Sequence, residues 1–289
     1  MPNPTALKHR IKSVRNTRQI TKAMELVSAS KMRRAQERAM LSRDYQNAAY
    51  DLLLKLNALP EVVSHPLFAH RKVSSRLYLV VTSNTGLAGA YNYNVLREFT
   101  AALKNDKDNK ITSYVITIGH KGAQFARRLE GVRLLAVYPA FGDQPTANDI
   151  RPILNTLIDE YRDKKIDEAE IIYTVFKSSI SQQALRLNLL PAHIEGSAAK
   201  PDDMAYTNFE PSVDEVLDNA AVRLIEVQIW QALLESLASE HSMRMVAMKS
   251  ATDNANDLID DLTLEFNTAR QAAITQELAE ITNGAEAIK

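Results

Sequence analysis

Six histidines and a few adjacent carboxylates are the side chains of this sequence that could carry out acid–base, nucleophilic or metal chemistry. None of the histidines has the H-x-x-x-H or H-E-x-x-H spacing of a zinc site, and no G-x-S-x-G nucleophile elbow is present. The paired carboxylates Asp260 and Asp261 lie in an acidic helical stretch, where solvated surface is their ordinary role. The chain has no cysteine, which excludes disulfides, thiolate nucleophiles and thiolate metal ligands. We therefore expect no catalytic residue, no metal site and no cofactor in this chain.

A phosphate-binding loop is the next chemistry to consider, because Ser83–Gly89 follows an apolar run and precedes a helical pattern. Loops in that position hold phosphates when they carry G-x-G-x-x-G or G-x-x-x-x-G-K-[ST]. Neither motif occurs anywhere in the sequence. A tight turn between strand and helix is therefore favoured, and a nucleotide-binding enzyme stays open only as an alternative.

The elements that would position any site follow from the distribution of glycine and proline. Neither residue occurs in the 55 residues of Thr5–Leu59 or in the 72 residues of Ser212–Asn283. Inside a helix, glycine costs about 1 kcal/mol and proline about 3 kcal/mol, so their confinement predicts two very long helices that flank one compact domain. Ser212 and Glu215 have the spacing of a capping box at the start of the second helix. We expect an N-terminal coiled-coil helix over 1–59, a central α/β domain over 60–211 and a C-terminal coiled-coil helix over 212–289.

Apolar residues in both long windows recur at the alternating three- and four-residue spacing of a coiled-coil seam. In the C-terminal window the seam is continuous and comprises Met245, Met248, Thr252, Ala255, Ile259, Leu262, Phe266, Ala269 and Ala273. In the N-terminal window a less regular stripe comprises Leu7, Ile11, Val14, Ile20, Met24, Val27, Leu41, Ala48 and Leu52. A long helix with one apolar stripe must pair with another surface, and the simplest partner of each helix is the other.

The net charge of zero, from 35 basic and 35 acidic residues, conceals two oppositely charged ends. Lys8–Arg43 contains eleven Lys or Arg and two Glu, whereas Ala251–Lys289 contains eight Asp or Glu and two Lys or Arg. Antiparallel pairing of the helices would bring parts of these two blocks together. The basic helix also leaves open a second function, that of a nucleic-acid-binding coiled coil, although no recognition motif and no interleaved aromatic residues accompany it.

The middle of the chain changes from helical spacing to short β-branched runs at Leu77–Val81, Ile111–Ile118, Val132–Val137 and Glu170–Phe176, with Ala184–Leu190 as a further candidate strand. Amphipathic helical patterns separate the first four runs, over Asn94–Leu103, Ala123–Glu130 and Asn148–Tyr161. This alternation predicts a Rossmann-like α/β domain with a mainly parallel sheet, joined to a long antiparallel coiled coil. The charged tract Lys104–Lys110 is expected to be a surface turn.

No segment has the composition of a membrane span. The longest stretch without Asp, Glu, Lys or Arg is Leu77–Leu96, and it contains many polar residues. The N-terminus is basic and has no apolar signal-peptide core, so a cleaved leader is not expected.

Four segments, in order and across essentially the whole chain, resemble the gamma subunit family of F-type ATP synthases. Ile11–Gln36 is similar to that family's N-terminal helix, and Met243–Asp261 is similar to the start of the distal part of its C-terminal helix. The loop Thr82–Asn92 is similar to the entry loop of its α/β domain, with Ala88 and Ala90 where Cys and Gly are frequent. The family's C-terminal signature is matched by Ile274, Thr275, Glu277, Glu280, Gly284, Ala285 and Ala287.

The resemblance implies a non-catalytic rotor subunit. In this family the terminal helices form an antiparallel left-handed coiled coil inside the hexamer of α and β subunits, and the α/β domain forms a foot, with the epsilon subunit, on the membrane ring of c subunits. Proton flow turns the ring and the shaft, and the asymmetric shaft drives each catalytic β subunit through its binding states. The N-terminus without a leader and the lack of the chloroplast Cys-bearing insert favour a bacterial member, peripheral on the cytoplasmic face of the inner membrane.

The resemblance also implies partner contacts, residue by residue. Contacts with the α and β subunits are implied for Met24, Lys31, Arg33, Arg34, Arg244, Arg270, Gln271, Thr275 and Glu277. Contacts with the rotor ring and the epsilon subunit are implied for Tyr206, Phe209 and Glu210. The family uses no cofactor in this subunit and no nucleic acid as a partner.

Overall fold

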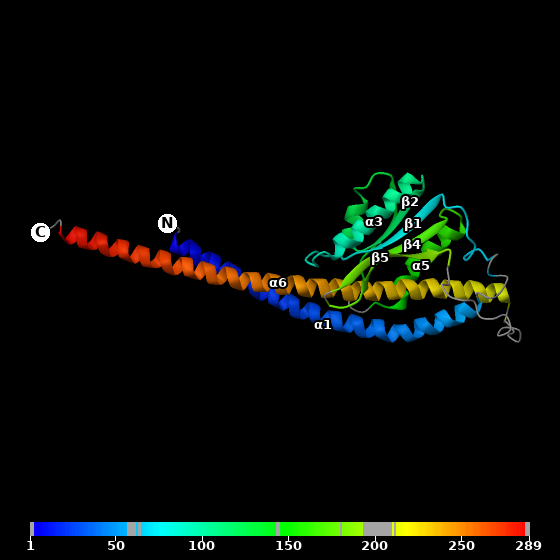
Figure 1. Cartoon of the computed structure of the whole chain (residues 1–289), viewed down its shortest axis with the longest axis horizontal. Coiled ribbons are helices and arrows are strands. Elements are labelled where there is room, and N and C mark those ends of the chain that lie inside the picture. Colours follow the sequence, from blue (N-terminus) through cyan, green and yellow to red (C-terminus); the bar gives the residue numbers. More distant parts are fainter. Residues whose placement is uncertain are drawn as a thin grey trace. The chain divides into compact units, whose positions relative to one another are not determined.

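The computed structural model describes residues 3–56, 62, 65–142, 145–179, 181–192, 210 and 212–286, with the side chains of 42–56, 147 and 284–286 left aside. Two helices dominate the chain, α1 (Pro4–Leu56) and α6 (Val213–Glu286) (Figure 1). Contacts divide the molecule into two compact units, one of Ala29–Met243 and one that combines Met1–Ser28 with Arg244–Lys289. The two long helices predicted from the glycine- and proline-free windows are thus confirmed. Each helix contributes to both units.

The larger unit contains a five-stranded sheet with the order β3-β2-β1-β4-β5. Its strands are β1 (Ser75–Val81), β2 (Thr112–Ile118), β3 (Val132–Tyr138), β4 (Glu168–Phe176) and β5 (Gln182–Leu190). The first four strands are parallel, and β5 pairs antiparallel with β4. The predicted, mainly parallel α/β sheet is therefore confirmed, including the further strand at its edge.

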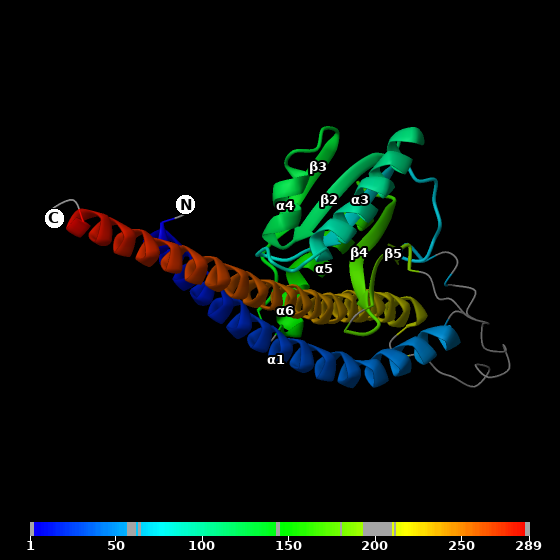
Figure 2. The same ribbon diagram turned by 60° about the vertical axis from the view of Figure 1, so that its left-hand side comes forward.

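Helices cover both faces of this sheet. On one face, α3 (Tyr91–Asp108) and α4 (His120–Ala126) pack on a cluster that includes Tyr78, Val80 and Val115, and Figure 2 shows the two helices on the same side. On the other face, α5 (Ala147–Arg162) and the first part of α6 share the main core. Because both faces are covered, the central strand β1 is buried from residue 77 to 81.

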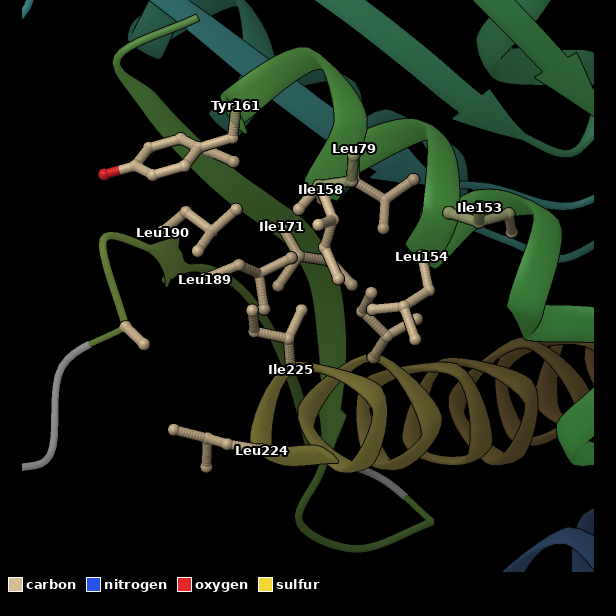
Figure 3. Packing of buried hydrophobic residues seen from close by; sticks show 14 of the residues in the cluster. Leu79, Ile153, Leu154, Ile158, Tyr161, Ile171, Leu189, Leu190, Leu224 and Ile225 are labelled. Carbon is tan, nitrogen blue, oxygen red and sulfur yellow. The ribbon is translucent and has the colours of Figure 1, made fainter. Parts of the chain in front are cut away.

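The main core joins the sheet to α6. Figure 3 shows Leu154 and Ile158 of α5 beside Ile171 of β4, with Ile225 of α6 facing the same cluster. At the start of α6, the Ser212 hydroxyl accepts a hydrogen bond from the Glu215 amide at 3.3 Å, which is one half of the predicted capping box. The beginning of α6 is therefore a core helix of the α/β unit, fastened by apolar burial.

Three buried serines fasten the next turns of α6 to the sheet. The Ser236 hydroxyl accepts from the Thr174 amide at 3.1 Å, and the Ser239 hydroxyl donates to the Thr174 carbonyl at 3.3 Å. One turn later, the Ser242 hydroxyl donates to the Ser179 carbonyl at 3.0 Å and accepts from the side-chain amide of Gln182 at 3.2 Å. The spacing of three residues places these hydroxyls on one face of the helix, against the end of β4.

The charged tract 104–110 differs from its prediction as a surface turn. Helix α3 continues to Asp108, and Asp106 is 0% exposed. Asp106 follows Val95, Phe99 and Ala102 at helical spacing, so it falls on the buried face of the helix. Its carboxylate accepts hydrogen bonds from the Tyr78 hydroxyl at 2.7 Å, from the Ser113 hydroxyl at 2.9 Å and from the Arg76 guanidinium. Burial raises the pKa of Tyr78, so the phenol keeps the proton that it donates.

The smaller unit is an antiparallel helix pair, because later residues of α1 meet earlier residues of α6. Leu7 and Ile11 cluster with Leu262 and Ala269, and Val14 and Phe266 pack alongside. Further along α1, the Thr21 and Thr252 hydroxyls lie 2.8 Å apart. Every predicted seam residue of α6 in this unit, from Met245 to Ala273, is buried or half-buried, so that seam is confirmed.

The seam predicted for α1 is partly wrong. Ile20, Val27 and Leu41 are 61%, 54% and 78% exposed, and Ala48 and Leu52 lie outside the described side chains. An unbroken four-and-three spacing instead connects these buried or half-buried residues: Leu7, Ile11, Val14, Arg18, Thr21, Glu25, Ser28, Met32, Ala35 and Ala39. Polar residues occupy part of this seam. The apolar pattern of the sequence therefore predicts exposed residues such as Ile20 and Val27 as seam positions in their place. Along the described ranges, no helix is long and apolar enough to cross a bilayer.

Replacing Asp106 with Asn should destabilise the chain by about 2–4 kcal/mol, because the Arg76 guanidinium loses a buried charged acceptor. Urea denaturation of the full chain measures the change. Asp108→Asn, in the exposed last turn of the same helix, is the matched control and should change the free energy of unfolding by less than about 0.5 kcal/mol. Equal effects of the two variants would contradict a buried ionic role for Asp106.

Asp167 should make stability depend on acid pH. Partial burial favours its protonated form, but hydrogen bonds donated by Ser74 and Ser75 hold the pKa of Asp167 below its usual value. A lowered folded-state pKa stabilises the fold above the unfolded pKa of about 3.9, and this contribution is lost as pH falls through the folded value. Asp167→Asn should therefore lower the free energy of unfolding at about pH 7, by about 1–2 kcal/mol, and the difference from the wild type should shrink below about pH 4. A difference independent of pH would rule out the ionised form as its cause.

Candidate functional site

The crevice at the carboxyl ends of the parallel strands is where doubly wound sheets bind their ligands. Here the loop after β1 fills that place. The Gly122 amide donates to the Thr82 hydroxyl at 2.8 Å, the Lys121 amide to the Ser83 carbonyl at 3.1 Å, and the His120 amide to the Asn84 side chain at 3.4 Å. The first amides of α4, which would otherwise face a phosphate, are therefore bonded to the chain itself.

Close packing leaves little space in this crevice. A Cβ atom on Gly119, which has φ +93°, would lie 2.2 Å from the Thr82 carbonyl oxygen, and one on Gly122 would lie 2.9 Å from the Thr82 hydroxyl. Among the described residues here, a cavity between Tyr91, Leu233 and Glu240 measures about 20 Å³. That volume holds about one water molecule and no nucleotide. The turn after β1 is therefore a structural junction, as its sequence favoured.

Charged groups with strongly shifted pKa values lie at the opposite, amino ends of the parallel strands. Arg76, at the start of β1, donates to Glu168 at 2.7 Å through Nε, and it also bonds the buried Asp106. Burial raises the pKa of the nearby Glu170. Perturbed pKa values often mark active sites. Here, however, the opposite charges pair with one another, and they lie at the amino ends of the strands, whereas such sheets bind ligands at the carboxyl ends. In the described part of the chain, no three His, Asp or Glu side chains gather where they could hold a metal ion.

Several of the residues predicted to contact other subunits are exposed on the long helices. Arg270, Gln271, Thr275 and Glu277 are all exposed, in the turns of α6 that follow Ala269, the last seam residue below 9% exposure. The Thr275 hydroxyl donates to the Gln271 carbonyl at 2.9 Å, which places those two residues on one face, one turn apart. The structure therefore gathers these four predicted contact residues at the end of α6.

Exposed apolar residues accompany them, and the sequence analysis did not single these residues out as contacts. Ile274, Leu278 and Ile281 are 48%, 59% and 68% exposed, at four- and three-residue spacing. Exposed apolar stripes of this kind are typical of surfaces that bind other proteins, and the spacing of this one is visible in the sequence.

The other predicted contacts differ in accessibility. Arg33 and Arg34 are exposed and Lys31 is half-buried, on neighbouring turns of α1 in the larger unit. Met24 is half-buried in the smaller unit, and Arg244 is only 8% exposed, so its own chain covers most of its guanidinium. Of the foot residues, Glu210 is exposed, whereas Tyr206 and Phe209 lie outside the described residues.

Comparison with known proteins identifies relatives along the entire chain. A family model described as ATP synthase matches residues 3–288. The chain is 39% identical to the ATP synthase gamma chain of Xylella fastidiosa (strain M12), over 289 residues and 100% of both chains. The ATP synthase gamma chain of Stenotrophomonas maltophilia (strain R551-3) is likewise 39% identical over 100% of both chains.

Solved structures share the fold. A chain of the Tetrahymena thermophila mitochondrial ATP synthase central stalk and c-ring superposes with a TM-score of 0.64 at 24% identity, over 80% of this chain and 99% of that one. A chain of the Euglena gracilis mitochondrial ATP synthase, from a structure of OSCP, F1 and c-ring, superposes with a TM-score of 0.71 at 18% identity, over 99% and 94%. At these identities the likeness concerns the fold.

Proposed function

The chain belongs to the ATP synthase gamma chain family, and from this premise we propose that it is the rotor subunit of the central stalk of an F-type ATP synthase. It couples rotation of the membrane ring to successive conformational changes at the catalytic β subunits and is not itself catalytic. The observation that carries the proposal is its similarity to bacterial gamma chains from end to end. The filled crevice of the α/β unit supports the non-catalytic role, because it leaves no room for a nucleotide.

The internal contacts suit a part that transmits torque. Residues 213–243 of α6 are held in the larger unit by the apolar core and by the serine hydrogen bonds to Thr174 of β4 and to Ser179. The same helix continues without a break to Glu286. A twist applied to its buried part is therefore carried along continuous backbone hydrogen bonds to the residues that pair with α1.

We assign 1–59 and 212–289 to the shaft and 60–211 to the foot. The shaft contacts the α and β subunits, and the foot contacts the epsilon subunit and the membrane ring of c subunits. The proposed α and β contacts are Met24, Lys31, Arg33, Arg34, Arg244, Arg270, Gln271, Thr275 and Glu277, together with the apolar stripe Ile274, Leu278 and Ile281. The proposed foot contacts are Tyr206, Phe209 and Glu210. The protein is peripheral, on the cytoplasmic face of a bacterial inner membrane.

The family assignment gives the nucleic-acid alternative no support. The basic residues of α1 that motivated it belong to the segment that resembles the gamma N-terminal helix. Their proposed partners are acidic residues of the β subunit. Single exposed ion pairs of this kind contribute about 0–1 kcal/mol, so these contacts guide the rotor surface more than they hold it.

Affinity purification of the tagged chain from detergent-solubilised membranes should recover the α, β, epsilon and c subunits with ATPase activity. A nuclease-treated sample should give the same set of proteins. Recovery of nucleic acid without α and β subunits would contradict the proposed function and favour a nucleic-acid-binding coiled coil.

Arg270→Ala should lower ATP synthesis by roughly tenfold while leaving the complex assembled, because a guanidinium that bonds acceptors shielded from water contributes about 1.5–3 kcal/mol. Synthesis in energised inverted vesicles measures the effect, and subunit composition checks the assembly. Thr268→Ala, an exposed position two residues earlier in the same helix, is the matched control and should synthesise at the wild-type rate. Wild-type synthesis by the Arg270 variant would remove this residue from the contact surface.

A further inference from the structure

A pair of hydroxyls interrupts the apolar seam of the helix pair. Thr21 of α1 and Thr252 of α6 are 8% and 7% exposed, and their Oγ1 atoms lie 2.8 Å apart. In the seam of α6 from Met245 to Ala273, Thr252 is the one polar residue. A buried hydroxyl destabilises a seam unless it is hydrogen-bonded, and the contact between these two hydroxyls supplies one such bond across the helices.

Each of the two hydroxyl protons has two acceptors within reach, the other hydroxyl and a carbonyl of its own helix. Besides each other, Thr21 Oγ1 lies 3.0 Å from the Arg18 carbonyl and Thr252 Oγ1 lies 2.8 Å from the Met248 carbonyl. If Thr252 donates to Thr21, then Thr21 donates to Arg18; if Thr21 donates to Thr252, then Thr252 donates to Met248. Both arrangements place each proton on an acceptor without water.

A second interhelical bond lies about one turn away. Arg18 Nη1 donates to Asn256 Oδ1 at 3.2 Å, and both residues are half-buried. Together, Arg18, Thr21, Thr252 and Asn256 form a polar layer that crosses the seam. Each of its two bonds joins a residue of α1 to one residue of α6, so both bonds form together in only one alignment of the helices.

We propose that this polar layer is a register lock, which selects one heptad alignment of the antiparallel helices. The apolar seam cannot make that selection alone. Its repeat is seven residues, so sliding one helix by about 10.5 Å again places seam positions opposite seam positions. Small residues such as Ala255 and Ala269 offer little steric resistance to that shift.

The two shifted alignments are penalised unequally. A shift that places Thr21 opposite Met245 also places Thr252 opposite Val14, so both hydroxyls face apolar side chains and Arg18 approaches Lys249. A shift in the other direction places Thr21 opposite Ile259 but Thr252 opposite Ser28, so one hydroxyl pair can form again. The layer therefore opposes the first shift more strongly. Fixed register matters for any shaft, because a slipping pair would change length instead of transmitting twist.

Cysteine cross-linking of the full chain tests the lock, because the sequence has no cysteine and every introduced pair reports without background. Ile11→Cys with Leu262→Cys reports the observed register, since both residues belong to one cluster. Ile11→Cys with Ala255→Cys and Ile11→Cys with Ala269→Cys report the two shifts. Under mild oxidation the wild-type layer should cross-link only the first pair, because a disulfide requires Cα atoms within about 7 Å.

In the double variant Thr21→Val, Thr252→Val, the shifted cross-links should increase at least about tenfold, because removing both hydroxyls removes the penalty on the shifted alignments. Thr21→Ser with Thr252→Ser keeps the pair and should behave as the wild type. Thr263→Val is the matched control, because the Thr263 hydroxyl bonds only the Ile259 carbonyl of its own helix at 2.6 Å. If the double valine variant keeps helical circular dichroism and still cross-links only 11 with 262, the proposal is overturned.

Discussion

The burial of α6 is the constraint on which the rest of the molecule depends. Backbone hydrogen bonds alone stabilise a helix only weakly in water, and most of the stability of a helix comes from packing its apolar face. A helix of 74 residues therefore depends on other elements that cover its apolar face. The sheet and α5 cover the first part, where residues 231–234 are all buried. Beyond Arg244, burial narrows to a single stripe that α1 covers. The same helix is therefore a core element in one unit and half of a coiled coil in the other.

This division explains why, among the residues that the structure describes, the crevice at the carboxyl ends of the strands is nearly filled. One face of the sheet must hold α6, and Leu233 and Glu240 of that helix line what remains of the crevice. The loop after β1 accepts hydrogen bonds from the first amides of α4. Those N–H groups are therefore already used within the chain and do not face a ligand. The sheet has the arrangement of a doubly wound α/β domain, and one of its faces packs against α6 in the main apolar core. The exposed chemistry of the chain then lies on surfaces suited to other proteins, such as the apolar stripe at the end of α6.

Sequence patterns predicted the elements that depend on backbone and apolar burial. The absence of glycine and proline identified both long helices, and the seam of α6 was predicted because its buried residues are almost all apolar. The seam of α1 was mispredicted because the polar residues Arg18, Thr21 and Ser28 occupy buried or half-buried positions. The partners of Arg18 and Thr21 lie on α6, and the local sequence of α1 does not reveal them. The burial of Asp106 was not predicted for the same reason: its partners Arg76 and Ser113 lie on β1 and β2, outside its own helix. The serine bonds to Thr174 and Ser179 likewise have no local signal, whereas the spacing of the exposed stripe that begins at Ile274 is visible in the sequence.

Rotation of the chain within a working complex tests the account most directly. Lys107→Cys places a unique thiol on the exposed end of α3, because the chain has no cysteine of its own. With the α and β subunits immobilised and a bead attached to that thiol, ATP should drive rotation of the bead in one direction, and rotation should stop when ATP is removed. Complexes that hydrolyse ATP at the normal rate while the labelled chain stays stationary would contradict the assignment of this chain as the rotor.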